Sequence, residues 1–141
     1  AVVATDMFPD QAGINLWSET GQHASSRGGL FKPNLVSKER FDKLVSFQHA
    51  DMNHISPELH GKFDFVWSTC SLEHVGSISL GHRFALDSME VLKPGGAAVH
   101  TVEFTLSSLD ETVERGDTAL WRKQDMQRLW EDHLSLGYEM Q

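Results

Sequence analysis

The sequence predicts an α/β fold in which a mostly parallel sheet carries helices on both faces. Short apolar runs with the length of buried strands alternate with stretches whose apolar residues recur at helical spacing. The run Phe63–Ser68 is apolar enough to be covered on both faces, as strands of a parallel sheet are. A helix and a further strand follow it, and this strand–helix–strand order is typical of parallel sheets.

In the first half of the chain, two predicted strands flank a long irregular segment. The expected elements are a strand at 1–5, a segment rich in Gly, Ser, Asn and Pro at 7–36 with a short helix at 11–17, a helix at 37–44, a strand at 45–50 and one helical turn at 56–58. Each strand ends at an acid, Asp6 or Asp51. Ser37 is a typical N-cap and Pro57 a typical first helical residue. A connection as long as the first one favours a functional loop or an insertion.

The second half has the pattern of strand, helix, strand, loop and helix. The expected elements are a strand at 63–68, a helix at 79–92, a strand at 97–103, a polar loop at 104–117 and a helix at 124–136. One apolar face of the first helix is formed by residues at spacings of three and four: Leu80, Phe84, Ala85, Met89 and Leu92. Pro94 and the two glycines after it are expected to end that helix, and Gly137 is the expected C-cap of the last one. The apolar face of the last helix consists of Met126, Leu129, Trp130, His133 and Leu134.

Length and composition limit the functional classes. A chain of 141 residues favours a single domain, residues 1–141. The net charge of −8 and the lack of a basic patch argue against a nucleic-acid partner. No apolar run approaches the ~20 residues of a membrane span, and no signal peptide opens the chain, so no membrane partner is expected. The single cysteine, Cys70, favours a reducing, cytoplasmic setting. Small molecules or proteins are the expected partners.

Polar residues follow every predicted strand. Ligands of an open parallel sheet bind beyond the carboxyl ends of its strands. Three of the four strand ends carry an acid, and carboxylates accept hydrogen bonds from ribose hydroxyls and from the exocyclic amine of adenine. The sequence thus favours an adenosine-type site, while turn caps are the alternative role for Asp6 and Asp51. Glu73 and His74 are candidates for a catalytic role, and the alternative is that they are a surface pair at the start of a helix.

Other residues with reactive or aromatic side chains are assigned structural roles. His100 lies in the middle of a strand and is expected to be a hydrogen-bonded core histidine. Cys70 is expected to be a small packing residue, and Trp121 and Trp130 are expected in the core. No metal site is expected, because the histidines at positions 49–60 lack a ligand spacing.

Two islands of sequence carry a resemblance to a known family. They are Phe-Asp-Phe-Val-Trp-Ser-Thr-Cys-Ser-Leu-Glu-His-Val at 63–75 and Val-Leu-Lys-Pro-Gly-Gly at 91–96. At this spacing the chain resembles the middle of a class I S-adenosylmethionine-dependent methyltransferase, over roughly residues 1–6 and 45–141. The resemblance implies a Rossmann-like fold, S-adenosylmethionine as cofactor, and methyl transfer to a small-molecule or carbohydrate-like acceptor.

The resemblance also assigns the residues of a cofactor site. Asp6 matches the acid that holds the ribose hydroxyls. Asp51 matches the acid that receives the adenine amino group, and Met52 would pack on the ring. The segment after the third predicted strand would pass beneath the cofactor. The cofactor-binding candidates are thus Asp6, Met7, Asp51, Met52, Ser68, Thr69 and Cys70.

The catalytic candidates are Glu73, His74 and Glu103. Methyl transfer needs the acceptor held in line with the methyl donor and a base, such as His74 or Glu103, to take the proton. Some small-molecule O-methyltransferases carry a similar Glu-x-x-Glu-His that binds a divalent ion. Cys70 stands in place of the first acid here, so this metal site is not expected.

The chain departs from the family pattern at one point. The family's first strand and its Gly-x-Gly-x-Gly loop would precede Asp6, where this sequence has only five residues. We therefore expect a domain truncated before the second strand, with weak cofactor binding. A non-catalytic fragment or binding domain is the alternative; a nicotinamide-dependent oxidoreductase would need a Tyr-x-x-x-Lys that Tyr138 does not provide. Open strand edges predict a homodimer.

Overall fold

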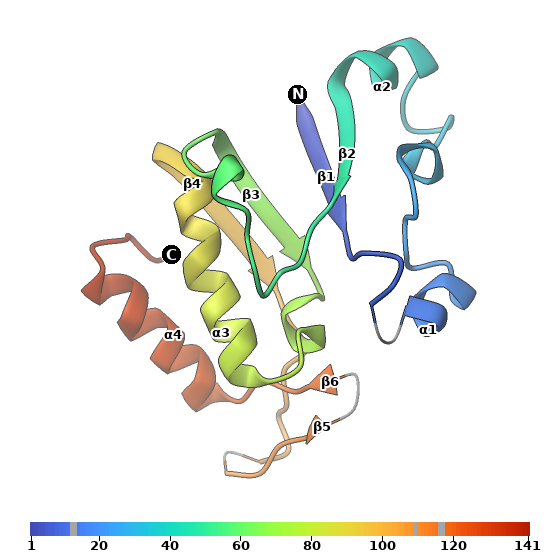
Figure 1. The fold of residues 1–141 in the computed structure, drawn as a ribbon. Coiled ribbons are helices and arrows are strands. Elements are labelled where there is room, and N and C mark those ends of the chain that lie inside the picture. Colours follow the sequence, from blue (N-terminus) through green and yellow to red (C-terminus); the bar gives the residue numbers. More distant parts are fainter. Residues whose placement is uncertain (12–13, 109, 116–117) are drawn as a thin grey trace. The chain divides into compact units, whose positions relative to one another are not determined.

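Figure 1 shows the computed structural model, which describes residues 1–11, 14–108, 110–115 and 118–141. The chain forms two compact units, residues 1–54 and 55–141, and each is described by itself. The described residues form a parallel strand pair in each unit and one antiparallel pair in the second. Parallel strands joined through helices confirm the predicted α/β class, while the single-domain organisation stays a prediction. No helix within these described ranges is long and apolar enough to cross a membrane.

The first unit is a parallel pair of strands with a long connection. Its elements are β1 (Val2–Asp6), α1 (Ile14–Glu19), a 3-10 turn (Arg27–Leu30), α2 (Lys38–Leu44) and β2 (Val45–His49). The strands pair along their whole length, so Asp6 lies opposite His49. Ser37 caps α2 as predicted, because its side chain accepts the Arg40 N–H at 3.3 Å. Of the helix predicted at 11–17, residues 12 and 13 lie outside the described residues.

Arg27 fastens the long connection to the junction of α2 and β2. Its Nε donates to the Val45 carbonyl at 2.7 Å, and its terminal nitrogen donates to Asp42 at 2.8 Å. The guanidinium also lies over the ring of Phe41, a buried apolar residue of this unit. A planar cation with five donors can make all these contacts at once. Arg27 thus holds the long connection against α2 and the start of β2.

The second unit packs two helices on one face of a parallel pair. Its elements are a 3-10 turn (Pro57–Leu59), β3 (Phe63–Thr69), a 3-10 turn (Leu72–His74), α3 (Ile78–Asp87), a 3-10 turn (Ser88–Val91), β4 (Leu92–Thr101), β5 (Glu114–Arg115), β6 (Thr118–Ala119) and α4 (Lys123–Ser135). Figure 1 shows α3 beside α4, where His82 and Asp132 pair at 3.1 Å. The buried apolar side chains of this unit are Leu72, Ile78, Phe84, Ala85, Val91, Ala119, Trp121 and Leu129.

The Lys-Pro-Gly-Gly segment is not the helix stop that we predicted. The helix has already ended at Val91, and residues 92–96 belong to β4. The register jumps between the pairs Phe63–Leu92 and Phe65–Ala97, so this part of β4 bulges away from β3. A bulge tolerates a proline, which cannot donate to a ladder, and it uses the left-handed φ of 81° at Gly95.

One face of the β3–β4 pair is exposed, contrary to the prediction that Phe63–Ser68 is covered on both sides. Side chains alternate between the faces, and those of the outer face are half-exposed: Phe65 at 47%, Trp67 at 55% and Val99 at 50%. Trp130 on α4 is also 41% exposed, because that helix buries Leu129 and His133 instead. The prediction of a core position was thus wrong for Trp130 and is confirmed for the fully buried Trp121.

Gly81, on the buried side of α3, is expected to tolerate no side chain. A Cβ there would lie 2.6 Å from the Leu72 carbonyl oxygen and 2.9 Å from Cζ2 of Trp121. Alanine normally stabilises a helix by about 1 kcal/mol relative to glycine, but overpacking costs about 1–3 kcal/mol. Gly81→Ala should therefore lower the free energy of unfolding in a urea titration. Gly29→Ala is the control, since its Cβ would meet nothing within 4 Å; equal stabilities of the two variants would contradict this packing.

Candidate functional site

Asp6, at the carboxyl end of β1, binds the backbone of the segment that follows it. One carboxylate oxygen accepts the Met7 N–H and the other accepts the Ala24 N–H, each at 2.8 Å. His23 lies 3.9 Å away. Asp6 thus caps the turn at the start of the long connection, which is the alternative role that we considered for it. A carboxylate offers about four acceptor positions, so capacity for a ligand hydroxyl remains.

The carbonyl oxygen of Met7 contacts two histidine side chains, and their proximity was not predicted from the sequence. His23 Nε2 lies 3.2 Å and His49 Nδ1 2.9 Å from this oxygen. Because a carbonyl only accepts, both ring nitrogens must carry their protons there. The His49 ring also packs against Phe8 and Phe47. Only the position of His49 at a strand end could have pointed to this cluster.

Asp51 follows β2 in a tight turn at the same edge as Asp6. Its Oδ1 accepts the Asn53 N–H at 2.8 Å, and its carbonyl accepts the His54 N–H at 3.0 Å. The Ala50 N–H donates to the Asp6 carbonyl at 2.9 Å, which places the two acids on adjacent backbone. The structure therefore brings Asp6 and Asp51 together, and Met7 and Met52 with them. Their roles toward a cofactor stay predictions, as does their convergence with residues 68–74.

The carboxyl end of β3 is an exposed turn. Cys70 adopts a left-handed φ of 46° and is exposed, so the prediction that it is a packing residue was wrong. Its N–H donates to the Thr101 carbonyl at 3.1 Å, which turns the chain outward after Thr69. A shallow hollow of about 400 Å³ lies on the exposed face of the pair. It is lined by Phe65, Trp67, Ser68, Thr69, Val99 and Thr101.

His100 is a hydrogen-bonded core histidine, as predicted. Its Nδ1 lies 2.8 Å from Ser68 Oγ, and its Nε2 lies 3.0 Å from Ser88 Oγ. The Ser88 hydroxyl donates its hydrogen to the Ala85 carbonyl at 2.8 Å, so it must accept a hydrogen bond from Nε2–H. The other ring nitrogen, Nδ1, is then unprotonated and must accept from the Ser68 hydroxyl. This fixes the neutral Nε2–H tautomer. Burial, aided by the charge of His133, lowers the pKa of His100 to about 4.

Glu73 and His74 form a 3-10 turn after β3 but face different surroundings. Glu73 is completely buried, so the interpretation of a surface pair was wrong for it. Its Oε1 accepts the N–H of Glu103, 3.3 Å away and two residues after the end of β4. His74 is half-buried, and the Glu103 side chain is exposed. The catalytic roles of all three stay predictions.

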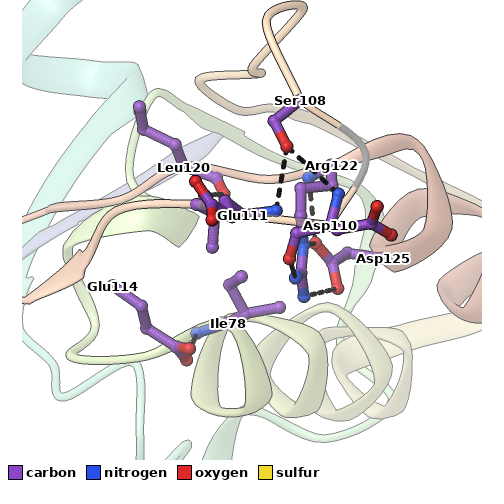
Figure 2. A network of polar contacts seen from close by, with 9 residues as sticks. Ile78, Ser108, Asp110, Glu111, Glu114, Leu120, Arg122 and Asp125 are labelled. Carbon is purple, nitrogen blue, oxygen red and sulfur yellow. Dashed lines mark hydrogen bonds and ion pairs between the residues drawn. The ribbon is translucent and has the colours of Figure 1, made fainter.

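The segment after β4 folds back over the start of α3, and Figure 2 shows the network that holds it. Glu114 accepts the Ile78 N–H at 2.8 Å and so satisfies a free donor at the start of α3. Two nitrogens of the Arg122 guanidinium donate to the two carboxylate oxygens of Asp125, at 2.7 and 2.9 Å. Its third nitrogen donates to the Asp110 carbonyl at 2.9 Å. Part of the predicted 104–117 loop is thus β5, which pairs antiparallel with β6; residues 109, 116 and 117 lie outside the description.

The fold and its strand ends together define a class of protein. Parallel strands place polar side chains at their carboxyl ends, as α/β proteins with nucleotide-type ligands do. Across the described ranges, no cluster of three or more His, Cys, Asp or Glu side chains is placed to hold a metal ion. The polar side chains at these strand ends are carboxylates, hydroxyls and imidazoles.

Comparison with known families identifies the chain further. A family model described as a methyltransferase domain matches residues 12–100, which is more than half of the chain. The chain belongs to this family and is a class I methyltransferase domain. The matched region contains Asp51, the β3 end and its Glu-His pair, whereas Asp6, Met7 and Glu103 lie outside it. No curated protein and no solved structure matches the chain.

Proposed function

We propose that this chain transfers the methyl group of S-adenosylmethionine to a small-molecule or carbohydrate-like acceptor in the cytoplasm. The observation that carries the proposal is the family match, read together with Asp6 and Asp51 on adjacent backbone at one sheet edge. Two carboxylates at such an edge suit a ribose and an adenine amine. Each keeps acceptor capacity beyond the backbone N–H groups that it binds.

The cofactor, when bound, supplies a methyl group on a positively charged sulfur. The chain's own residues would then bind the adenosine part, hold the acceptor in line and take its proton. His74 and Glu103 are the candidates for the last task, since they flank the ends of β3 and β4. A base that takes the acceptor's proton contributes roughly 10²–10⁴-fold to a rate. The acceptor atom forms the new bond to the methyl carbon as the carbon–sulfur bond breaks.

A non-catalytic methyltransferase-like binding domain is the second candidate. It is favoured by the sequence, whose 141 residues contain no Gly-x-Gly-x-Gly segment. Such glycines permit the close backbone approach to the cofactor that larger residues block. For the same reason, we expect cofactor binding by the first candidate to be weak.

Calorimetric titration with S-adenosylmethionine and S-adenosylhomocysteine distinguishes the two candidates. We expect weak binding of both ligands, which Asp51→Ala reduces by on the order of 1–3 kcal/mol, or roughly 5–150-fold in Kd. His74→Ala should leave this Kd unchanged and reduce any turnover by roughly 10²–10⁴-fold. Glu19→Ala removes an exposed carboxylate of the same unit and is the control. No binding at millimolar ligand would favour the non-catalytic domain, and equal effects of the first two variants would contradict this division of roles.

A further inference from the structure

Glu73 has a side chain whose burial needs an explanation. Glutamate is almost never completely buried without a partner, yet Glu73 has no exposed surface. Its Oε1 accepts the Glu103 N–H, whereas no hydrogen-bond partner in the described part of the chain reaches Oε2. An unpaired buried polar atom costs about 1–3 kcal/mol. An apolar side chain of similar size would avoid this cost, so the carboxylate must do something that a leucine could not.

The segment that Glu73 holds begins at Glu103, just after the end of β4. The Glu103 carbonyl accepts the Trp121 N–H at 3.0 Å, and the Trp121 carbonyl accepts the Thr105 N–H at 2.8 Å. Trp121 itself is completely buried, near Gly81 and Leu72. Backbone pairing with Trp121 therefore fixes one side of the segment, and the Glu103 N–H on the other side donates to the carboxylate of Glu73.

The two candidate bases are thereby tied to one residue. His74 is the next residue along the chain in the same 3-10 turn, and Glu103 is bound through its backbone. We infer that Glu73 is a positioning residue, which sets the spacing between His74 and Glu103 at the carboxyl ends of β3 and β4. Because its side chain is buried, it acts through these two neighbours and touches neither cofactor nor acceptor. The inference rests on the proposed methyl transfer for its consequence, but its geometry can be tested without it.

Amide hydrogen exchange at Glu103, measured by NMR, tests the inference. Glu73→Gln keeps an oxygen acceptor and should preserve protection of the Glu103 amide. Glu73→Leu removes the acceptor and should speed exchange at Glu103 by roughly tenfold, the equivalent of one ordinary hydrogen bond. The Cys70 amide, which donates to Thr101 at the same sheet edge, should stay unchanged and is the internal control.

Two results would overturn the positioning role. In the first, Glu73→Leu leaves exchange at Glu103 unaltered. In the second, it speeds exchange at Glu103 and Cys70 alike, which would show a loss of general stability only. The Kd of S-adenosylhomocysteine should be the same for wild type and Glu73→Gln. A complete lack of ligand binding with the expected exchange pattern would refute the proposed function and leave the positioning role intact.

Discussion

Lowering the pH from 7 to 4.5 is expected to destabilise the second unit by about 2 kcal/mol through the single residue His100. Its imidazole is neutral in the folded protein, because Ser88 can only accept from Nε2–H while Ser68 donates to Nδ1. Protonation would turn Nδ1 into a second donor facing that hydroxyl, in a position that burial has largely removed from water.

The sign follows from the two pKa values. The folded-state pKa is about 4, with burial as its main cause, against an ordinary value of 6.5. The unfolded chain therefore takes up a proton first as the pH falls. The stabilisation is complete above pH 6.5 and is lost progressively between pH 6.5 and 4. Burial also lowers the pKa of His82, although Asp132 opposes this, so a second histidine contributes in the same direction.

Urea titrations at several pH values isolate the His100 contribution when wild type is compared with His100→Gln. A glutamine can accept from Ser68 through its oxygen and donate to Ser88 through its nitrogen, yet it does not titrate. The variant should thus keep most of the stability at pH 7 and lose about 2 kcal/mol less than wild type on acidification. Parallel losses in the two proteins would exclude His100 as the source.

The sequence was informative wherever the cause of a structure is local. The cap of α2 depends on Ser37 and an N–H three residues away, and the parallel strand pairs follow from apolar runs of the right length. The core role of His100 followed from its position inside a strand. Such features involve few residues, and their chemistry is visible in the order of the amino acids.

Features that depend on distant partners could not be predicted in this way. The burial of Glu73 depends on a backbone N–H thirty residues further on, and nothing in Leu-Glu-His-Val indicates that partner. The exposure of Phe65 and Trp67 depends on what packs against the sheet, which an apolar run alone does not reveal. The two histidines on the Met7 carbonyl come from segments 26 residues apart. The candidate site was therefore predicted in its residue types and strand ends, but not in its hydrogen bonds.

Replacing Trp67 with lysine is expected to abolish self-association of the chain. Within the second unit, β3 pairs only with β4 among the described residues. Phe65 and Trp67 stack at 5.8 Å on the exposed face, and Val99 lies beside Trp67 in the register. The Cys70 N–H points to β4, and backbone groups alternate between the two edges of a strand. The N–H groups of Phe65 and Trp67 are therefore directed to the edge of β3 opposite β4, which a second strand can extend.

We expect the partner at this edge to be a second copy, with β3 antiparallel to itself about Val66. In that register Phe65 lies opposite the partner's Trp67, which is a favourable aromatic cross-strand pair. Asp64 lies opposite the partner's Ser68 and is already paired with Lys93 at 2.9 Å. No like charges meet, although each copy carries a net charge of −8. The half-exposed side chains supply on the order of 300 Å² per copy, well below the usual ~800 Å², so the dimer should be weak.

Light scattering over a range of protein concentrations measures this association. The wild type should rise above the monomer mass of 15.8 kDa as concentration increases, and Trp67→Lys should remain at that mass. Trp130→Lys is the matched control, because it makes the same charge change at another half-exposed tryptophan, on α4. It should associate like wild type, since its position is away from β3. A wild type that stays monomeric throughout would contradict the dimer. Pairing at the β3 edge is what distinguishes the two tryptophans, so an equal loss of association in both variants would show that the added charge, and not this edge, is responsible.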